Sequence, residues 1–222
     1  MNKRRNVLSE TLKINEIFFS IQGESTFAGL PCVFVRLSGC NLRCSWCDTE
    51  YAFYEGEFYT IEKILAEIKE YKCSLVEITG GEPLLQKNVL PLMEILCDNG
   101  YEVLLETGGH MDISEVDQRV KRIVDIKCPE SGESNKVLIQ NLGCLSKTDQ
   151  LKFVLSSKSD YAWAKNFINE HKLSGTCPII FSPVFGRLDN RDLAEWILAD
   201  NLPVRMQLQM QKYIWPPDAR GV

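Results

Sequence analysis

Short apolar runs alternate with amphipathic segments along this chain, and that alternation limits its fold more than any other feature. The runs predicted to form strands are residues 33–37, 75–78, 102–105, 122–125, 151–155, 178–181 and 204–208. Between them, apolar residues recur at helical spacing after Thr60, Asn88 and Asp189, whose side chains suit helix N-caps. The alternation predicts an α/β fold in which crossover helices connect parallel strands.

The length of the chain fits one such unit. Its 222 residues lie at the small end for a single (β/α) barrel, and a hydrophobic fraction of 45% is enough to fill a core of that size. The sequence contains no internal repeat and no linker rich in proline, glycine or serine. We therefore expect residues 1–222 to form a single domain that binds its ligands at the carboxyl ends of the strands.

Three cysteines directly follow the first predicted strand. Cys40, Cys44 and Cys47 have the spacing CxxxCxxC. A [4Fe-4S] cluster normally takes four thiolates, so a loop that offers three leaves one iron open to another ligand. S-adenosylmethionine (SAM) can chelate that iron through its amino and carboxylate groups, and the reduced cluster then releases a 5′-deoxyadenosyl radical. This spacing resembles that of the radical SAM superfamily.

Structural zinc is an alternative for the same cysteines. Such a site needs four nitrogen or sulfur ligands. The nearest further thiol, Cys32, lies where a predicted strand begins, and neither His110 nor His171 follows a CxxC pair at zinc-finger spacing. The sequence favours a cluster over zinc. A non-enzymatic iron-sulfur or zinc interaction module is kept as an alternative.

Composition limits the location and the partners of the protein. The cysteine count of nine is odd, and the first residues carry no apolar stretch of signal-peptide length, which predicts a reducing, cytoplasmic location. No run approaches the roughly 18 apolar residues that span a bilayer, so we expect no membrane partner. The net charge is −5 and the basic residues are scattered, which disfavours nucleic-acid binding.

Polar loops follow several of the predicted strands. The sequence Thr-Gly-Gly-Glu-Pro occupies residues 79–83, and further polar clusters lie at residues 106–109 and 125–127. Paired glycines let a ligand approach the backbone, and the Glu82 carboxylate can accept hydrogen bonds from an ammonium group. Each loop alone is compatible with an ordinary turn. Together with the cysteine loop, they predict one binding site at a single edge of the sheet.

Four segments narrow the resemblance from the superfamily to one family: residues 14–25, 34–40, 44–49 and 78–83. The sequence Ile-Gln-Gly-Glu, ahead of Arg-Leu-Ser-Gly-Cys at the end of a strand, resembles the 7-carboxy-7-deazaguanine synthase family of the radical SAM superfamily. The resemblance implies a partial (β/α) barrel of the radical SAM type. It also implies conversion of 6-carboxy-5,6,7,8-tetrahydropterin to 7-carboxy-7-deazaguanine with loss of ammonia, in 7-deazapurine (queuosine-type) biosynthesis. The implied cofactors are a [4Fe-4S] cluster, SAM and Mg²⁺.

The resemblance also assigns the residues of the site. It implies that Cys40, Cys44 and Cys47 hold the cluster and that Thr49 binds Mg²⁺. The implied SAM-binding residues are Trp46, Cys47, Asp48, Gly81, Glu82, Thr107, Asp125, Ile126, Lys127 and Ser182, and the implied substrate-binding residues are Ile21, Gln22, Gly23, Glu24, Arg36, Thr79 and Gln211. Gln22 and Glu24 suit the donor and acceptor edge of a pterin. Gln211 stands where many relatives have histidine, so this position does not titrate near neutral pH.

The same resemblance implies the partners. We expect flavodoxin or ferredoxin as reductant, a homodimer, and the small-molecule pterin as substrate. An activating enzyme for a glycyl-radical protein would share the cluster loop and the Gly-Gly-Glu-Pro sequence but would act on a protein. Incubation with the carboxypterin separates these two functions, because only the synthase forms a deazaguanine.

Overall fold

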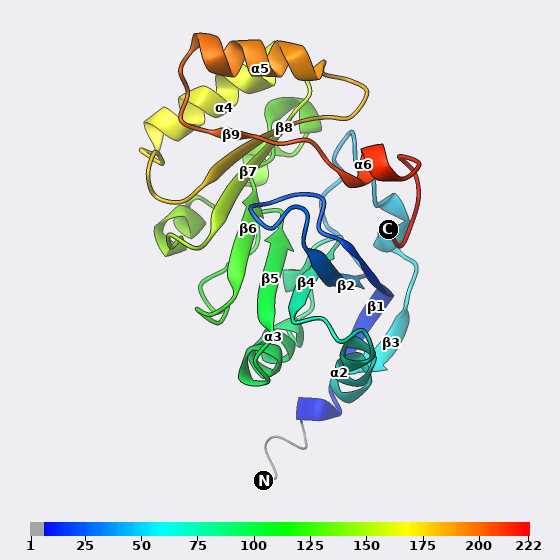
Figure 1. The fold of residues 1–222 in the computed structure, drawn as a ribbon. Helices are drawn as coiled ribbons and strands as arrows, with labels where there is room; N and C mark the ends of the chain where they lie inside the picture. Colours follow the sequence, from blue (N-terminus) through cyan, green and yellow to red (C-terminus); the bar gives the residue numbers. More distant parts are fainter. Residues whose placement is uncertain (1–6) are drawn as a thin grey trace.

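A computed structural model describes residues 7–222 and contains one mixed sheet in the strand order β3-β1-β2-β4-β5-β6-β7-β8-β9. β1 pairs antiparallel with both β2 and β3, whereas every neighbouring pair from β2 to β9 is parallel. The strands are β1 (Thr11–Ile21), β2 (Pro31–Leu37), β3 (Glu57–Thr60), β4 (Leu75–Gly80), β5 (Glu102–Thr107), β6 (Lys121–Asp125), β7 (Gln150–Leu155), β8 (Ile179–Pro183) and β9 (Arg205–Met206). They follow an arc, as in a barrel that is not closed (Figure 1).

Helices cover the outer side of this arc, with α2 and α3 at one end and α4 and α5 at the other (Figure 1). The helices are α2 (Ile61–Glu70), α3 (Val89–Asp98), α4 (Lys158–Glu170), α5 (Asn190–Ala199) and the short α6 (Gln211–Ile214). Two predicted N-caps are present: Thr60 Oγ1 accepts from Lys63 N at 3.2 Å, and the Asp189 side chain accepts from Arg191 N at 2.8 Å. Asn88 precedes α3 but makes no side-chain cap, because its amide donates to the carbonyl oxygen of Thr11.

The predicted α/β fold with parallel strands is confirmed, and the partial barrel is consistent with it. The sequence did not predict β1, β3 or α4. In β1 the strand register shifts between Ile14 and Glu16, so the alternation of buried and exposed residues breaks in the middle of the strand. The connection from β6 to β7 also differs from the pattern, because it consists of the 3₁₀ turns η3 (Pro129–Ser131), η4 (Ser134–Lys136) and η5 (Ile139–Cys144).

Two layers of side chains fill the inside of the arc. At the amino ends of the strands the inner layer is apolar and consists of Phe18, Cys32, Phe34, Leu75, Leu104 and Ile123. Two residues further along the same strands the inward positions are polar, as at Arg36, Glu77, Glu106 and Asp125. The apolar layer therefore forms the floor of a polar cleft at the carboxyl ends of the strands.

The loop between β1 and β2 reaches across the inside of the arc to the last strands. Thr26 N–H donates to Gln150 Oε1 on β7 at 2.7 Å, and Gln207 Nε2, just after β9, donates to the carbonyl oxygen of Ser25 at 2.7 Å. Met210 N–H donates to the carbonyl oxygen of Gly23 at 3.0 Å. This loop joins the two ends of the open barrel and carries residues 22–24 into the cleft.

Candidate active site

A cleft of about 490 Å³ lies at the carboxyl ends of the strands. Most of the residues that the sequence singled out line it: Ile21, Gln22, Glu24, Arg36, Cys40, Cys44, Trp46, Cys47, Asp48, Thr49, Thr79, Gly81, Thr107, Asp125, Lys127 and Gln211. Gly23, Glu82, Ile126 and Ser182 are not among the lining residues. Ile126 packs in the outer hydrophobic core, and Ser182 is fully buried with no hydrogen-bond partner for its hydroxyl within the described part of the chain.

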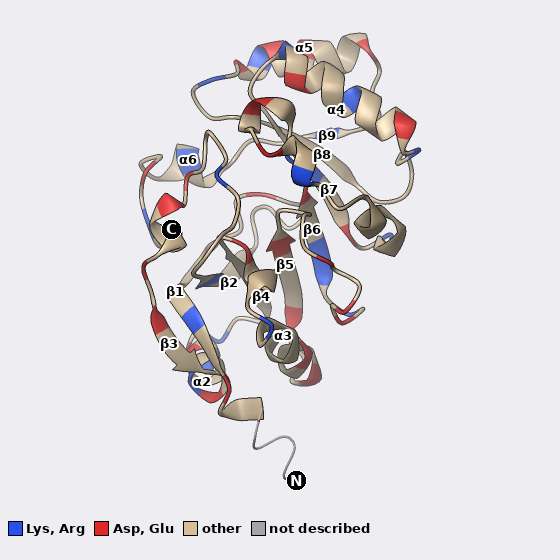
Figure 2. Ribbon diagram, turned by 180° about the vertical axis from the view of Figure 1, so that it is seen from behind, with Lys and Arg blue, Asp and Glu red and all other residues tan. Residues whose placement is uncertain are grey.

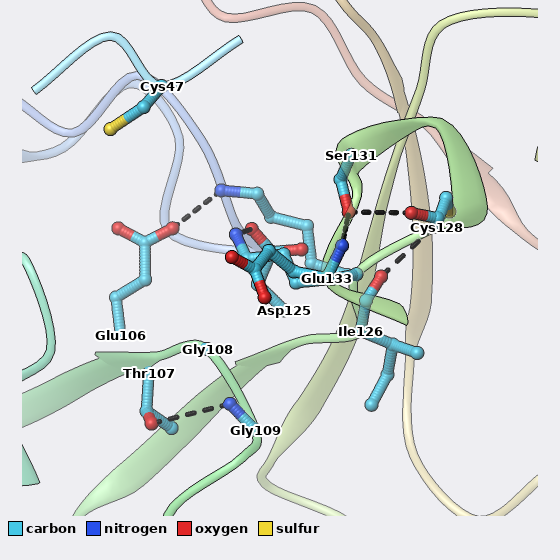
Figure 3. A network of polar contacts seen from close by, with 12 residues as sticks. Cys47, Glu106, Thr107, Gly108, Gly109, Asp125, Ile126, Cys128, Ser131 and Glu133 are labelled. Carbon is cyan, nitrogen blue, oxygen red and sulfur yellow. Dashed lines mark hydrogen bonds and ion pairs between the residues drawn. The ribbon is translucent and has the colours of Figure 1, made fainter. Parts of the chain in front are cut away.

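The cluster loop, residues 40–49, is held from outside the cleft. Arg43 N–H donates to Glu133 Oε1 at 2.6 Å, and Ser45 N–H donates to the carbonyl oxygen of Ser131 at 3.0 Å. Figure 3 shows the segment around Ser131 and Glu133 on the far side of Asp125 from Cys47. These contacts involve the loop backbone, so they fix its path without engaging the cysteine thiols.

The three thiols line the cleft with few protein partners. Cys40 Sγ accepts from Leu42 N at 3.4 Å, and Cys47 Sγ lies 3.8 Å from the Thr49 hydroxyl. Burial raises the pKa of the Cys44 thiol to about 11, although the nearby Lys127 ammonium acts in the opposite direction. A metal must therefore displace these protons when it binds.

The spread of the thiols suits a cluster better than a single ion. Within residues 7–222, no three His, Cys, Asp or Glu side chains gather closely enough to hold one metal ion. A tetrahedral zinc ion draws all its thiolates to about 2.3 Å from one point, whereas a [4Fe-4S] cluster binds each thiolate at a different iron. Three separated thiols around one cleft therefore fit the cluster.

The loop after β4 presses directly against the cluster loop. A Cβ atom on Gly81 would lie 2.2 Å from the carbonyl oxygen of Gly39 and 2.7 Å from Cys40 Cβ. Gly80 has a φ of +144° and would meet the carbonyl oxygen of Leu37 at 2.2 Å. Only glycine permits these approaches, so Gly81 sets the distance between the β4 loop and the cluster loop, and Gly80 sets that between the ends of β4 and β2.

Glu82 ties the β4 loop to the loop after β5. Its carboxylate accepts from the backbone N–H groups of Leu84 at 3.0 Å and Gly108 at 2.9 Å, and from Thr107 Oγ1 at 2.9 Å. Burial raises its pKa, and these hydrogen bonds oppose that rise. The Glu82 carboxylate thus lies behind Thr107, which itself lines the cleft.

Asp125, the last residue of β6, forms an ion pair with Lys127 just after the strand, and only one of its two carboxylate oxygens takes part. Lys127 Nζ binds Asp125 Oδ2 at 2.7 Å, and the Asp125 carboxylate raises the pKa of Lys127 against the effect of burial. Asp125 Oδ1 is buried without a hydrogen-bond partner among the described residues. This free acceptor next to the cluster loop fits a polar ligand with hydroxyl or amino donors (Figure 3).

A second group of charged side chains lines the cleft, and we call Gln22, Glu24, Glu77, Glu106 and Lys152 the Lys152 network. Lys152 Nζ lies 2.7 Å from Glu24 Oε2 and 2.5 Å from Glu106 Oε1. Burial would raise the pKa of Glu24, but Lys152 and two amide donors outweigh it and hold that pKa at about 2. The carboxylate of Glu24 is therefore ionised at neutral pH.

Gln22 and Glu77 complete the Lys152 network. Gln22 Oε1 accepts from the backbone N–H of Glu24 at 2.6 Å, and its Nε2 donates to Glu77. Burial, followed by the charge of Glu106, raises the pKa of Glu77 well above its usual range. On the same wall, Thr79 Oγ1 donates to Glu106 Oε2 at 3.2 Å.

Arg36, on β2, is fixed by an ion pair behind the cleft wall. Its Nε donates to Glu16 Oε1 at 2.7 Å, and the same oxygen accepts from the Tyr51 hydroxyl at 2.8 Å. The guanidinium lies over the rings of Phe18 and Tyr51. Burial would lower the pKa of Arg36, but these partners raise it, so the residue brings a fixed positive charge to the cleft.

The segment after β9 closes one side of the cleft. The Nε2 atoms of Gln209 and Gln211 each donate to Glu24 Oε1 at 2.9 Å, and Lys212 Nζ binds Asp48 Oδ2 at 2.9 Å. The Gln211 amide lies against Gly23, where a Cβ would meet Gln211 Oε1 at 1.9 Å. Pro217, Asp218, Ala219, Arg220 and Val222 also line the cleft.

Thr49 precedes the 3₁₀ turn η1 (Glu50–Phe53) at its N-cap position, but its hydroxyl makes no capping hydrogen bond. Its backbone carbonyl accepts from Ala52 N at 2.9 Å. The side chain is therefore not used as a helix cap, and it lines the cleft beside Cys47.

Sequence reasoning did not select Glu77, Glu106 or Lys152 as site residues. Each lies inside or at the end of an otherwise apolar strand, at an inward position. A charged residue at such a position in a buried strand is uncommon unless it has a partner. These charged residues in buried strands could therefore have been predicted to have partners. The partners themselves could not be identified, because they depend on the order of the strands in the sheet.

Known proteins resemble this chain over nearly its whole length. A model of the radical SAM superfamily matches residues 34–129. The chain is 52% identical over 214 residues to the 7-carboxy-7-deazaguanine synthase of Chlorobaculum tepidum, covering 95% of this chain and 97% of that protein. It is 46% identical over 226 residues to the 7-carboxy-7-deazaguanine synthase of Koribacter versatilis, covering 95% and 100%. Its structure matches the crystal structure of QueE from Escherichia coli with a TM-score of 0.75 and 26% sequence identity, covering 90% and 94% of the two chains.

Proposed function

This chain belongs to the 7-carboxy-7-deazaguanine synthase family of the radical SAM superfamily, and we propose that its cleft converts 6-carboxy-5,6,7,8-tetrahydropterin to 7-carboxy-7-deazaguanine with loss of ammonia. It is a radical SAM enzyme of 7-deazapurine biosynthesis. The observation that carries the proposed reaction is that one cleft holds both the free thiols of the cluster loop and the polar Lys152 network. Neither alternative, a glycyl-radical activating enzyme or a non-enzymatic module, is favoured by these relatives.

Cys40, Cys44 and Cys47 would hold the [4Fe-4S] cluster, and SAM would lie beside it. When bound, the cluster and SAM supply the 5′-deoxyadenosyl radical that removes hydrogen from the substrate. The free acceptor of Asp125, which lines the cleft, supports a role in binding SAM, and Ser182, buried beneath the cleft lining, is proposed for the same site from the family resemblance. The tight contact between Gly81 and the cluster loop supports a role in placing the SAM methionine against the cluster. Trp46, Asp48, Thr107, Ile126 and Lys127 complete the proposed SAM site, and Glu82 supports it from behind Thr107.

The Lys152 network and its neighbours would bind the pterin. Glu24 is ionised and can accept hydrogen bonds from the amino and ring N–H groups of the substrate. Arg36 brings a positive charge that suits the substrate carboxylate. Ile21, Gln22, Gly23, Thr79 and Gln211 form the rest of the proposed substrate site. The Gln22 amide is already bonded at both ends, so it would act by fixing Glu24.

Thr49 is the proposed protein ligand of Mg²⁺. Its hydroxyl makes no capping bond and lies 3.8 Å from the thiol of Cys47. Mg²⁺ keeps several waters and usually takes only one or two ligands from protein, with others from the substrate. One hydroxyl together with the substrate carboxylate meets that requirement.

Three further features are proposed for the enzyme from its resemblance to the family. We propose flavodoxin or ferredoxin as the reductant, a homodimer as the assembly, and the cytoplasm as the location. Among residues 7–222, no helix is long and apolar enough to cross a membrane. The continuous sheet supports the proposal that residues 1–222 form a single domain. Figure 2 shows acidic and basic residues interspersed over the elements of the ribbon, which supports a small-molecule partner rather than a nucleic acid.

Product analysis tests the proposed function. The protein is reconstituted with iron and sulfide under anaerobic conditions and incubated with SAM, dithionite, Mg²⁺ and the carboxytetrahydropterin. Mass spectrometry is expected to show 7-carboxy-7-deazaguanine in the wild type and none in Cys44→Ala. Cleavage of SAM with no change in the pterin would contradict the proposed substrate, and no cleavage of SAM would contradict the radical chemistry itself.

A further inference from the structure

Lys152 occupies an unusual place for a lysine. It lies on β7 between the buried residues Leu151 and Phe153, and its side chain is only 4% exposed. The ammonium group faces the cleft rather than solvent. The charged or titratable groups around it are Glu24 on the loop after β1, Glu77 on β4, Glu106 on β5, and Asp125 and Lys127 on β6 and just after it.

The ammonium is the shared partner of two carboxylates that reach it from different walls of the cleft. Glu24 Oε2 lies 2.7 Å and Glu106 Oε1 lies 2.5 Å from Lys152 Nζ. The second oxygen of each carboxylate is also engaged, by Gln209 and Gln211 in Glu24 and by Thr79 in Glu106. Lys152 therefore fixes the direction of both acids as well as their charge.

Removing this charge would change the ionisation of the cleft. Two carboxylates that meet in a partly buried cleft without a cation repel each other, which favours protonation of one of them. Glu77 shows this trend, because burial and the neighbouring Glu106 raise its pKa, and its carboxyl is bonded to the Gln22 amide rather than to the lysine. Burial also acts to raise the pKa of Glu24, whose side chain is 16% exposed, yet Lys152 and the amides of Gln209 and Gln211 hold that pKa low.

We propose that Lys152 is a positioning residue that keeps Glu24 and Glu106 as oriented hydrogen-bond acceptors, so that the cleft selects a flat ring that presents N–H donors. This inference rests on the proposed pterin substrate. A protonated carboxyl keeps one accepting oxygen but presents a hydroxyl on the other, and a hydroxyl directed at a ring N–H sets donor against donor. The same positive charge also offsets the acidic residues of the cleft, so that a substrate that carries a carboxylate can enter.

The test compares Lys152→Met, Lys152→Arg and the exposed control Lys147→Met. For Lys152→Met we expect the KM of the pterin to rise by about ten- to a hundredfold at pH 7 and to fall again as the pH rises, because deprotonation restores the acceptors. Uncoupled formation of deoxyadenosine from SAM should stay near the wild-type rate. Lys152→Arg should recover most of the loss, and Lys147→Met should show none.

A second measurement, the melting temperature as a function of pH, tests the Lys152 network in the absence of substrate. Without the lysine, the folded-state pKa of Glu24 lies above its unfolded value, so its stabilising contribution is present at acid pH and is lost as the pH rises through the folded pKa. The melting temperature of Lys152→Met should therefore fall between about pH 5 and pH 8, relative to the wild type. The double variant Lys152→Met/Glu24→Gln should lose much of this fall and should cost less than the two single variants combined.

The possible results separate the two proposals. If the wild type does not convert the pterin, the proposed function fails, and the melting temperatures still test Lys152. If the wild type converts the pterin while Lys152→Met keeps its KM and an unchanged pH profile of stability, the positioning role of Lys152 is wrong. Equal loss of SAM cleavage and of pterin turnover in soluble Lys152→Met would also overturn the positioning role, because the substitution would then have disturbed the fold as a whole rather than the binding of the pterin.

Discussion

The cluster loop and the Lys152 network line one cleft, but their polar side chains differ in how many protein partners they have. The thiols of Cys40, Cys44 and Cys47 have only weak contacts with the protein. In the Lys152 network, Glu24 Oε1 accepts amide hydrogen bonds, Glu24 Oε2 forms an ion pair with Lys152, and both ends of the Gln22 amide are hydrogen-bonded. Under the proposed function, one region keeps its thiols free for a cofactor, whereas the other is organised before any substrate arrives.

This difference matches the chemistry that each region has to perform. A cluster forms strong bonds to thiolates and can order a loop as it binds, so its ligands need only a common cleft. A small planar substrate supplies only a few hydrogen bonds, and acceptors already held in place reduce the entropy lost on binding. The comparison predicts that changes in the cluster loop abolish the chemistry, whereas changes at the substrate residues weaken recognition.

The largest effect is expected from Cys44→Ala. Loss of one of three thiolates should remove the stable cluster and all SAM cleavage, because no other thiol lies in the cluster loop. The measurement is iron content together with deoxyadenosine formation. Cys97→Ala is the matched control, since Cys97 lies on α3 and does not line the cleft. Retained turnover in Cys44→Ala would end the assignment.

A smaller effect is expected from Glu24→Gln and Arg36→Ala. Each removes a charged hydrogen bond worth roughly 1.5–3 kcal/mol, which corresponds to about a ten- to a few hundredfold loss in kcat/KM for the pterin. SAM cleavage without substrate should largely survive, because neither residue belongs to the cluster loop. Glu62→Gln, an exposed change on α2, is the control. Normal kinetics in both variants would place the substrate elsewhere.

Gly81→Ala tests the contact between the β4 loop and the cluster loop. The new Cβ would lie 2.2 Å from the carbonyl oxygen of Gly39, so the two loops must separate. We expect a loss of about 1–3 kcal/mol in the free energy of unfolding and about a tenfold slower SAM cleavage, because SAM is displaced from the cluster. Gly143→Ala, where no atom lies within 4 Å of the new Cβ, should match the wild type. Equal behaviour of the two variants would mean that this contact does not position SAM.

The smallest effect is expected at Thr49. Turnover of the wild type should rise several-fold with millimolar Mg²⁺, and Thr49→Ala should lose most of that rise, because the substrate carboxylate alone holds the ion weakly. Thr49→Ser keeps the hydroxyl and should keep the activation. SAM binding, measured by equilibrium dialysis, should not change. The same Mg²⁺ response in all three proteins would leave Thr49 with only its backbone role at the start of η1.

The sequence predicted the parts of the structure that depend on local pattern. The parallel strands and the helix caps at Thr60 and Asp189 follow from residues close together in the chain. The CxxxCxxC spacing of the cluster loop is also local, because its three cysteines lie within eight residues. β1 escaped prediction because the register shift near Ile14 breaks its alternation.

The substrate side was harder to predict because its contacts depend on strand order. Nothing near Lys152 in the sequence indicates that Glu24 and Glu106 are its partners, since β5 and β7 are separated in the sheet by β6. Cysteines outside the cluster loop show a related limit. Their side chains suit a buried apolar position, as for Cys128 and Cys177, but Cys73, Cys97 and Cys144 are only half-buried because they lie at turns and helix ends.

The span of chain enclosed by each region has a consequence for how the enzyme matures. The bonds from Gln209 and Gln211 to Glu24 join residues 185 and 187 positions apart, whereas the hydrogen bond from Arg43 to Glu133 that holds the cluster loop spans 90 positions. The entropy lost in closing a loop grows with its length, so the cluster loop can be fixed before the last residues dock. Under the proposed function, a chain whose last residues have not yet docked can present its three thiols to iron. Metal loading can therefore precede completion of the pterin pocket, and iron content alone does not report a finished enzyme.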